Sequence, residues 1–125
     1  MRIGVDIQGL ADVREALMTH GDRYRRTIFT VSEVADCGGP TADASVAAPG
    51  LAERFAAKEA VLKALQVTDR IPAWTEIELV RGSDGRLSVR LSGTATELAR
   101  EVPLIEFNVS VSHSDHVAIA VVVAD

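Results

Sequence analysis

The chain has 125 residues, a length that suits one domain with a single core. Hydrophobic residues make up 47% of it and charged residues 25%, which is ordinary for a folded protein. The net charge of −5 argues against a general nucleic-acid binder, because such proteins neutralise phosphates with lysine and arginine. The single cysteine, Cys37, excludes an internal disulfide and a thiolate metal cage. No stretch is long enough to span a bilayer and no signal-peptide pattern is present, so we expect a cytoplasmic protein without membrane contacts.

The first part of the chain predicts one strand and two helices. Residues 2–7 are apolar and rich in β-branched side chains, which indicates a buried strand. Residues 10–20 carry apolar side chains at helical spacing, and Gly21 is placed to end that helix. Thr30-Val-Ser-Glu33 has the spacing of a capping box, so a short helix should begin there. Residues 37–50 contain three glycines and two prolines and are predicted to form a loop.

Residues 51–65 are predicted to form a long helix, because they consist of strong helix formers without glycine or proline. Apolar side chains occur on nearly all sides, a pattern typical of a buried helix. Glu59 and Lys63 are at i,i+4 spacing, roughly 40° apart around the axis, among small or apolar neighbours. A buried charge needs a partner, so we expect some group to lie opposite Glu59.

The second half of the chain consists mainly of predicted strands. Residues 75–80 and 87–91 alternate polar and apolar side chains, and Ser83-Asp84-Gly85 supplies the turn of an antiparallel hairpin. The remaining elements are a helix over 93–101 and strands over 105–112 and 117–123. This order predicts a single α+β domain.

Asp6 stands in the apolar N-terminal strand, which is an unusual place for a carboxylate. One interpretation is that it caps the following helix or supports a turn. The other is that Asp6 and Glu59 meet across a strand–helix contact, where two carboxylates repel unless a proton or cation intervenes. Two oxygen ligands, with room for water and substrate phosphates, is the usual way in which proteins bind Mg²⁺. Lys63 could then contact a phosphate, although its spacing from Glu59 also fits an ordinary helix ion pair.

Two further polar clusters are compatible with a structural or a functional role. Ser110, His113 and Asp115 lie close together in sequence, but residues on one turn do not readily form a catalytic triad, and no Gly-x-Ser-x-Gly elbow is present. We interpret them as a polar hairpin end. Four arginines fit a solvated face or a surface that receives an acidic partner: Arg14, Arg23, Arg25 and Arg26.

Several motifs occur in order along the chain. Gly4-Val-Asp-Ile7 is followed by Arg14, by Phe29-Thr30 and by Glu33. The long predicted helix carries Arg54-Phe-Ala-Ala-Lys-Glu59-Ala-Val-Leu-Lys63-Ala64, and a late strand carries Val109-Ser-Val-Ser-His113. In these motifs the chain resembles the holo-acyl-carrier-protein synthase group of 4′-phosphopantetheinyl transferases. The resemblance implies one phosphopantetheinyl transferase domain over residues 1–125, with a mostly antiparallel sheet packed on a long central helix.

The resemblance implies an enzyme that transfers 4′-phosphopantetheine from coenzyme A to a serine of an apo acyl or peptidyl carrier protein and releases 3′,5′-adenosine diphosphate. Asp6 and Glu59 would hold Mg²⁺, and these two with Lys63 would form the catalytic group. The expected base is Glu59 or a metal-bound water. Family members of this short type form homotrimers with active sites between subunits, in fatty acid or polyketide biosynthesis.

The expected coenzyme A contacts are Lys63, Arg54, Asn108, Ser110, Ser112 and His113. The expected carrier-protein contacts are Arg14, Arg25 and Arg26.

Three positions depart from the pattern of the family. Residues 66–69 stand where a Gly-Thr-Gly-like segment is usual, Gly85-Arg86-Leu87 stands where Gly-Lys-Pro is common, and Asn108 replaces a histidine. Asparagine can form hydrogen bonds but cannot become cationic. A second hypothesis is therefore a non-catalytic member that binds coenzyme A or a carrier protein, and a third is a structural subunit of a larger synthase. The retained Asp6, Glu59 and Lys63 favour the enzyme.

Overall fold

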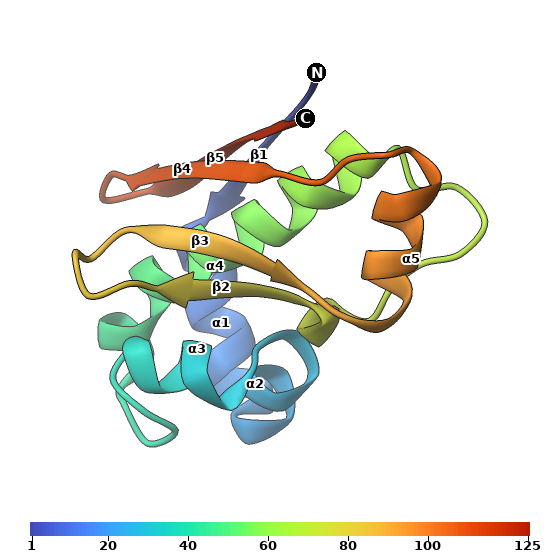
Figure 1. The fold of residues 1–125 in the computed structure, drawn as a ribbon. Coiled ribbons are helices and arrows are strands. Elements are labelled where there is room, and N and C mark those ends of the chain that lie inside the picture. Colours follow the sequence, from blue (N-terminus) through green and yellow to red (C-terminus); the bar gives the residue numbers. More distant parts are fainter.

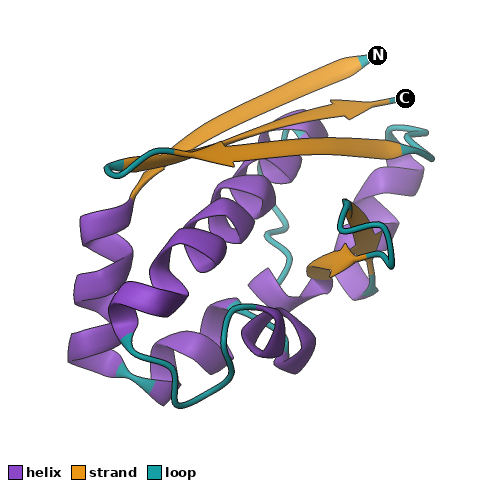
Figure 2. Ribbon diagram, turned by 90° about the vertical axis from the view of Figure 1, so that its left-hand side faces the viewer, coloured by secondary structure: helices purple, strands orange, loops and turns teal.

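Three antiparallel strands cover one side of the longest helix (Figure 1). Their order in the sheet is β1–β5–β4, with bounds of Arg2–Gly9 for β1, Phe107–His113 for β4 and Val117–Ala124 for β5. The helix beneath them is α4, Ala44–Leu65, which packs mainly on β1 and β5 (Figure 2). The computed structural model describes residues 1–125 throughout.

The other elements surround α4 away from this sheet (Figure 1). Three helices precede it: α1, Leu10–His20; α2, Asp22–Ile28; and α3, Val31–Asp36. A hairpin follows it, formed by β2, Ile77–Arg81, and β3, Leu87–Leu91, after a short 3₁₀ turn over Trp74–Glu76. Helix α5, Gly93–Glu101, connects the hairpin to β4. The predicted α+β architecture, with a mostly antiparallel sheet on a long central helix, is confirmed. No helix of the chain combines the length and the apolar character that a membrane crossing requires.

Local sequence signals explain where two of the helices begin or end. The Thr30 hydroxyl accepts a hydrogen bond from the backbone N–H of Glu33, and the Glu33 carboxylate accepts one from the N–H of Thr30. This reciprocal pair is the predicted capping box, and α3 starts directly after it. Helix α1 ends before Gly21, whose φ of 52° lies in the left-handed region that glycine tolerates.

Two segments differ from the sequence-based expectation. The predicted loop over 37–50 is wrong for its second half, because α4 begins at Ala44 and includes Pro49 and Gly50. Proline removes one backbone donor, but burial of Ala47, Ala48 and other side chains keeps this turn helical. Residues 22–28 form helix α2, a segment for which the sequence predicted no element and only the basic charge of its arginines was noted.

The crossing of β1 over α4 is unusually close at Gly4. A Cβ atom at this position would lie 1.9 Å from the carbonyl oxygen of Ala60, so only glycine fits. Because side chains alternate along a strand, Asp6 lies on the same α4-facing side as Gly4. The outer face of the sheet is apolar and exposed, and it comprises Ile3, Val5, Ile7, Val117, Ile119 and Val121.

Candidate active site

The side chains of Asp6 and Lys63 meet where β1 crosses α4. Lys63 Nζ lies 3.0 Å from Asp6 Oδ1 and 2.9 Å from the carbonyl oxygen of Val5. The other Asp6 oxygen accepts a hydrogen bond of 2.7 Å from the Gln8 side-chain amide. Asp6 is 13% exposed and Lys63 is 54% exposed, so the pair opens to solvent on the lysine side. Asp6 does not cap α1, whose N-cap is Gly9, and this excludes the capping interpretation.

Glu59 is the unsatisfied member of this cluster. Burial raises the pKa of its carboxyl, the charge of Asp6 raises it further, and Lys63 opposes the shift. No hydrogen bond or ion pair within the chain involves the Glu59 side chain. The predicted group opposite Glu59 is therefore Asp6, and the one lysine of the cluster forms its ion pair with Asp6 alone. Such a cluster has spare capacity for a cation.

The donor set fits a hard divalent cation. Asp6 and Glu59 offer carboxylate oxygens, which are the ligands that Mg²⁺ prefers. The chain has no cluster of three or more histidine, cysteine, aspartate or glutamate side chains that could enclose a metal. A cation held by these two carboxylates would keep most of its coordination sphere for water and substrate oxygens, as is usual for Mg²⁺ in proteins.

The predicted coenzyme A contacts on β4 lie at the opposite edge of the sheet. Ser110 and Val5 are both registered against Val121 of β5, so a full strand separates the two edges. The side chains of Asn108, Ser110 and Ser112 are exposed on the outer face. A single chain therefore does not bring these residues together with the Asp6–Glu59–Lys63 cluster.

A groove lies beside β4, between this strand and the hairpin. Its volume is about 650 Å³, and Asn108 and Ser110 contribute to its lining. The hairpin contributes Arg81, Arg86 and Ser88, and α4 contributes Glu53. Sequence reasoning did not select Arg81, Ser88 or Glu53. The alternation along the hairpin placed Ser88 on its polar side, but it put Arg81 on the same face as Ile77 and Leu79, so it gave no signal for Arg81.

Arg54, another expected coenzyme A contact, is buried on a different side of α4. Its Nη1 donates a hydrogen bond of 3.1 Å to the carbonyl of Gly50, and its Nη2 lies 3.6 Å from Asp36 Oδ2. The Nε and Nη2 groups have no hydrogen-bond acceptor. A contact with coenzyme A stays a prediction for Arg54, whose buried guanidinium is ion-paired with Asp36.

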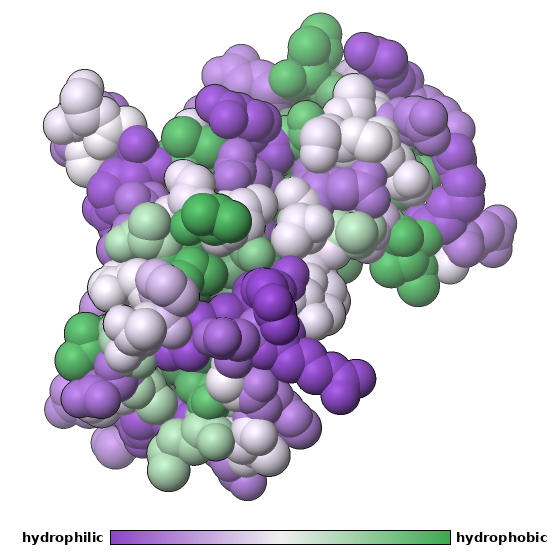
Figure 3. Space-filling view, turned by 90° about the horizontal axis from the view of Figure 1, so that it is seen from below, coloured by the Kyte–Doolittle hydropathy of each residue, from purple (hydrophilic) through white to green (hydrophobic).

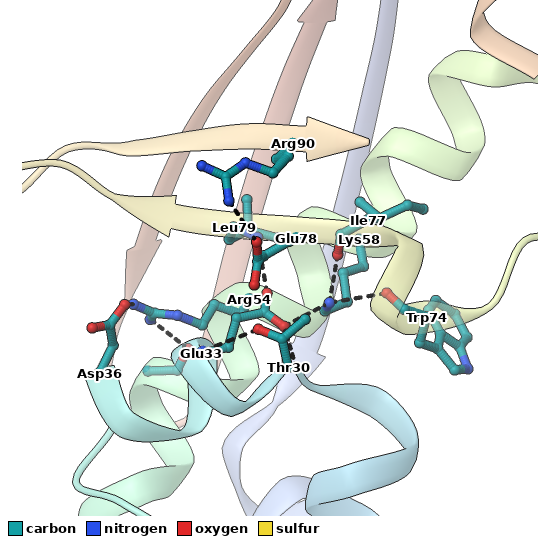
Figure 4. A network of polar contacts seen from close by, with 11 residues as sticks. Thr30, Glu33, Asp36, Arg54, Lys58, Trp74, Ile77, Glu78, Leu79 and Arg90 are labelled. Carbon is teal, nitrogen blue, oxygen red and sulfur yellow. Dashed lines mark hydrogen bonds and ion pairs between the residues drawn. The ribbon is translucent and has the colours of Figure 1, made fainter. Parts of the chain in front are cut away.

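A closed ion-pair network lies next to Arg54 on α4 (Figure 4). The fully buried Lys58 ammonium lies 2.8 Å from Glu33 Oε1 and also donates to the carbonyls of Trp74 and Ile77. The second Glu33 oxygen accepts a hydrogen bond of 2.9 Å from the N–H of Leu79. Burial lowers the pKa of Lys58, and attraction to Glu33 opposes that shift. The network joins α3, α4 and the hairpin, and every donor and acceptor in it is occupied.

The basic residues of α1 and α2 have unequal exposure. Arg26 is exposed and Arg14 is half-buried, so both guanidinium groups can reach an acidic partner. Arg25 is buried instead, with Nη2 donating a hydrogen bond of 2.9 Å to the carbonyl of Ala42. It ties α2 to the segment before α4, and this burial disfavours a direct carrier contact for Arg25.

Comparisons with known proteins agree with this fold. A model described as the 4′-phosphopantetheinyl transferase superfamily matches residues 2–122. A holo-[acyl-carrier-protein] synthase of Chloroflexus aurantiacus is 42% identical, with 97% of this chain and 95% of the relative covered. One from Leptospira biflexa is 37% identical, with 98% and 94% covered.

Solved structures show the same architecture. Helicobacter pylori holo-[acyl-carrier-protein] synthase in complex with coenzyme A has a TM-score of 0.83 at 26% identity, with 98% of this chain and 99% of that chain covered. A Bacillus anthracis holo-(acyl-carrier-protein) synthase in complex with CoA (3′,5′-ADP) has a TM-score of 0.76 at 27% identity, with 98% and 94% covered. The chain therefore belongs to the 4′-phosphopantetheinyl transferase superfamily. Its similarity to holo-[acyl-carrier-protein] synthases extends over nearly the full length, so the predicted enzyme family is confirmed.

Proposed function

We propose that the chain transfers 4′-phosphopantetheine from coenzyme A to a serine of an apo acyl or peptidyl carrier protein, in a Mg²⁺-dependent reaction that releases 3′,5′-adenosine diphosphate. The observation that carries the proposal is the Asp6–Glu59–Lys63 cluster, in which Lys63 pairs with Asp6 and the neighbouring Glu59 carboxylate has no partner. Relatives of high coverage bear the name of this activity, and two similar structures are complexes with coenzyme A or its 3′,5′-ADP part.

Each residue of the cluster has a distinct role in this scheme. Asp6 and Glu59 would hold Mg²⁺, which when bound neutralises charge on the coenzyme A pyrophosphate. The half-exposed Lys63 ammonium can leave Asp6 for a phosphate oxygen and stabilise the charge that develops on the leaving phosphate. Positioning and charge neutralisation of this kind dominate catalysis of phosphoryl-type transfer.

The carrier serine must also lose its proton. Our candidate for the base is Glu59 or a water bound to the metal. In the metal-free chain burial and the neighbouring Asp6 raise the pKa of the Glu59 carboxyl, and a bound cation would oppose this shift.

The separation of the two sheet edges supports a shared active site. Asp6 lies on β1, whereas Asn108 and Ser110 lie on β4 with β5 between them. A site that uses both edges needs a second copy of the chain. An exposed apolar sheet face is a typical contact surface between copies, and the outer face of this sheet is apolar and exposed, so we infer a homotrimer with the active sites between subunits. The groove of about 650 Å³ would receive the nucleotide end of coenzyme A.

The carrier protein would dock on α1 and α2. Arg14 and Arg26 can pair with an acidic carrier, and the exposed Met18 between them adds apolar surface. Seen from the side of α2 and α3, apolar side chains form small areas separated by hydrophilic ones (Figure 3). The proposal places this reaction in the cytoplasm, in fatty acid or polyketide biosynthesis, with no nucleic-acid or membrane partner.

Intact-protein mass spectrometry tests the activity. The purified chain, coenzyme A and Mg²⁺ should convert apo carrier proteins to their holo forms, and chelation of the metal should stop the conversion. Asp6→Ala or Glu59→Ala should reduce the rate by about 100-fold or more while the circular dichroism spectrum stays unchanged. Absence of conversion across fatty acid, polyketide and peptide carriers would contradict the proposal. Coenzyme A binding without any product would favour a non-catalytic member, the alternative that Asn108 and residues 66–69 support.

A further inference from the structure

The end of β4 is tied to α4 by one carboxylate–imidazole pair. His113 Nδ1 lies 3.0 Å from Glu53 Oε2, and the two residues are 60 positions apart in sequence. The Glu53 side chain is 16% exposed and His113 is 44% exposed. No other hydrogen bond or ion pair involves Glu53. The carboxylate is therefore committed to the histidine.

This pair fixes which ring nitrogen of His113 carries a proton. An ionised carboxylate only accepts hydrogen bonds, so Nδ1 must be the protonated nitrogen in the contact with Glu53. The partner of one ring nitrogen determines the state of the other. Nε2 lies on the far side of the ring and has no partner within the chain. It is the ring nitrogen that is free to meet a ligand.

The groove beside β4 is lined by more cationic than anionic side chains. Glu53 is the single acidic residue among the groove-lining residues, which include Arg81 and Arg86. Two guanidinium groups therefore outweigh the one carboxylate, and the lining suits an anionic ligand.

We propose that Glu53 is a positioning residue for coenzyme A binding. It holds His113 by Nδ1 and so leaves Nε2 as the ring nitrogen available to the ligand. The inference rests on the proposed function and adds to it a residue that makes no direct contact with the reacting atoms.

Two substitutions at Glu53 distinguish the loss of the hydrogen-bond acceptor that orients His113 from the loss of the Glu53 negative charge alone. Glu53→Ala removes the acceptor, and we expect the KM for coenzyme A to rise about tenfold with kcat nearly unchanged, as when ligand binding is weakened without loss of transition-state contacts. Glu53→Gln keeps an oxygen that accepts from Nδ1, so it should restore part of the affinity. Calorimetric titration with coenzyme A should show the same order of affinities without depending on turnover.

Nitrogen-15 NMR of the histidines reports which ring nitrogen carries the proton. It therefore distinguishes an orienting role of Glu53 from a purely structural one. In the wild-type protein the neutral His113 ring should carry its proton on Nδ1. In Glu53→Ala it should change to the Nε2-protonated form that an unconstrained imidazole prefers.

Glu78→Gln is a matched control, because Glu78 is 17% exposed and has one ion pair, with Arg90 at 3.4 Å, outside the groove. It should leave the KM for coenzyme A and the His113 spectrum unchanged. An unchanged KM or an unchanged tautomer in a folded Glu53→Ala protein would overturn the inference. If the wild-type protein shows no transfer, the proposed function fails, and the calorimetry and NMR still decide the role of Glu53.

Discussion

Two lysines of helix α4 pair with carboxylates, and the two pairs differ in their exposure and in how completely their charged atoms are partnered. Lys58 and Glu33 are both 0% exposed, whereas Lys63 is 54% exposed beside Asp6. In the buried pair each charged atom has its full set of partners. In the exposed cluster a second carboxylate, Glu59, has none. The buried pair, in which every charged atom has its partners, therefore maintains the architecture. The cluster near solvent, whose charges are incompletely neutralised, is the place for a ligand.

Breaking the buried pair should have the largest effect. Lys58→Met removes the cation and leaves the Glu33 carboxylate buried without it, so we expect the free energy of unfolding to fall by about 3–5 kcal/mol. Urea denaturation followed by circular dichroism measures this loss. The double variant Lys58→Met/Glu33→Gln removes both charges and should recover part of the stability. A loss below about 1 kcal/mol in Lys58→Met would show that the pair does not maintain the fold.

Changing the crossing of β1 over α4 tests how closely the exposed cluster depends on the backbone. The new Cβ in Gly4→Ala would lie 1.9 Å from the Ala60 carbonyl oxygen, so β1 must move. We expect a loss of about 1–3 kcal/mol, together with reduced transfer because Asp6 moves with the strand.

Gly9→Ala in the same strand is the control for this prediction. Its Cβ would meet only the end of the Asp12 side chain, at 2.9 Å, which can rotate away. If Gly4→Ala were as stable as Gly9→Ala in thermal melts, the close crossing would not be what positions Asp6.

The sequence predicted the exposed cluster better than the buried pair, and the reason is physical. The i,i+4 spacing of Glu59 and Lys63 and the odd position of Asp6 are visible locally, and they lie on two elements whose patterns are clear. Glu33 was recognised as a capping residue and as part of the family motif, but not as the partner of Lys58. Its second carboxylate oxygen meets Leu79, 46 residues away, and no local pattern encodes such a contact.

Two errors have related causes. The start of α4 was missed because Pro49 and Gly50 resemble loop residues, and tertiary burial of the neighbouring alanines overrides their propensity. The burial of Arg25 was missed because a long side chain can either extend into solvent or fold back to a backbone carbonyl, and the sequence does not distinguish these.

The raised pKa of Glu59 predicts a smaller effect, in which the contribution of the exposed cluster to the free energy of unfolding depends on pH. In the metal-free protein the folded state binds the Glu59 proton more tightly than the unfolded state. Between the ordinary pKa of glutamate and the raised value, stability should therefore fall as pH rises. Glu59→Gln removes this titration, so its urea midpoint should depend less on pH across this window than that of the wild-type protein. Equal pH dependence in both proteins would mean that burial and Asp6 do not raise the pKa of Glu59 in the folded state.

The smallest expected change in stability is that of Lys63→Gln. Because the lysine is half-exposed, water replaces its contact with Asp6, and the free energy of unfolding should change by about 0–1 kcal/mol. Transfer to the carrier should nevertheless fall, with less effect on Mg²⁺ dependence, since a phosphate contact is lost while both carboxylates stay. Parallel urea titrations and transfer assays of Lys63→Gln and Lys58→Met test this directly. The two lysines lie five residues apart on one helix, so a loss of stability in Lys63→Gln as large as that in Lys58→Met would contradict the distinction between an architectural pair and a ligand site.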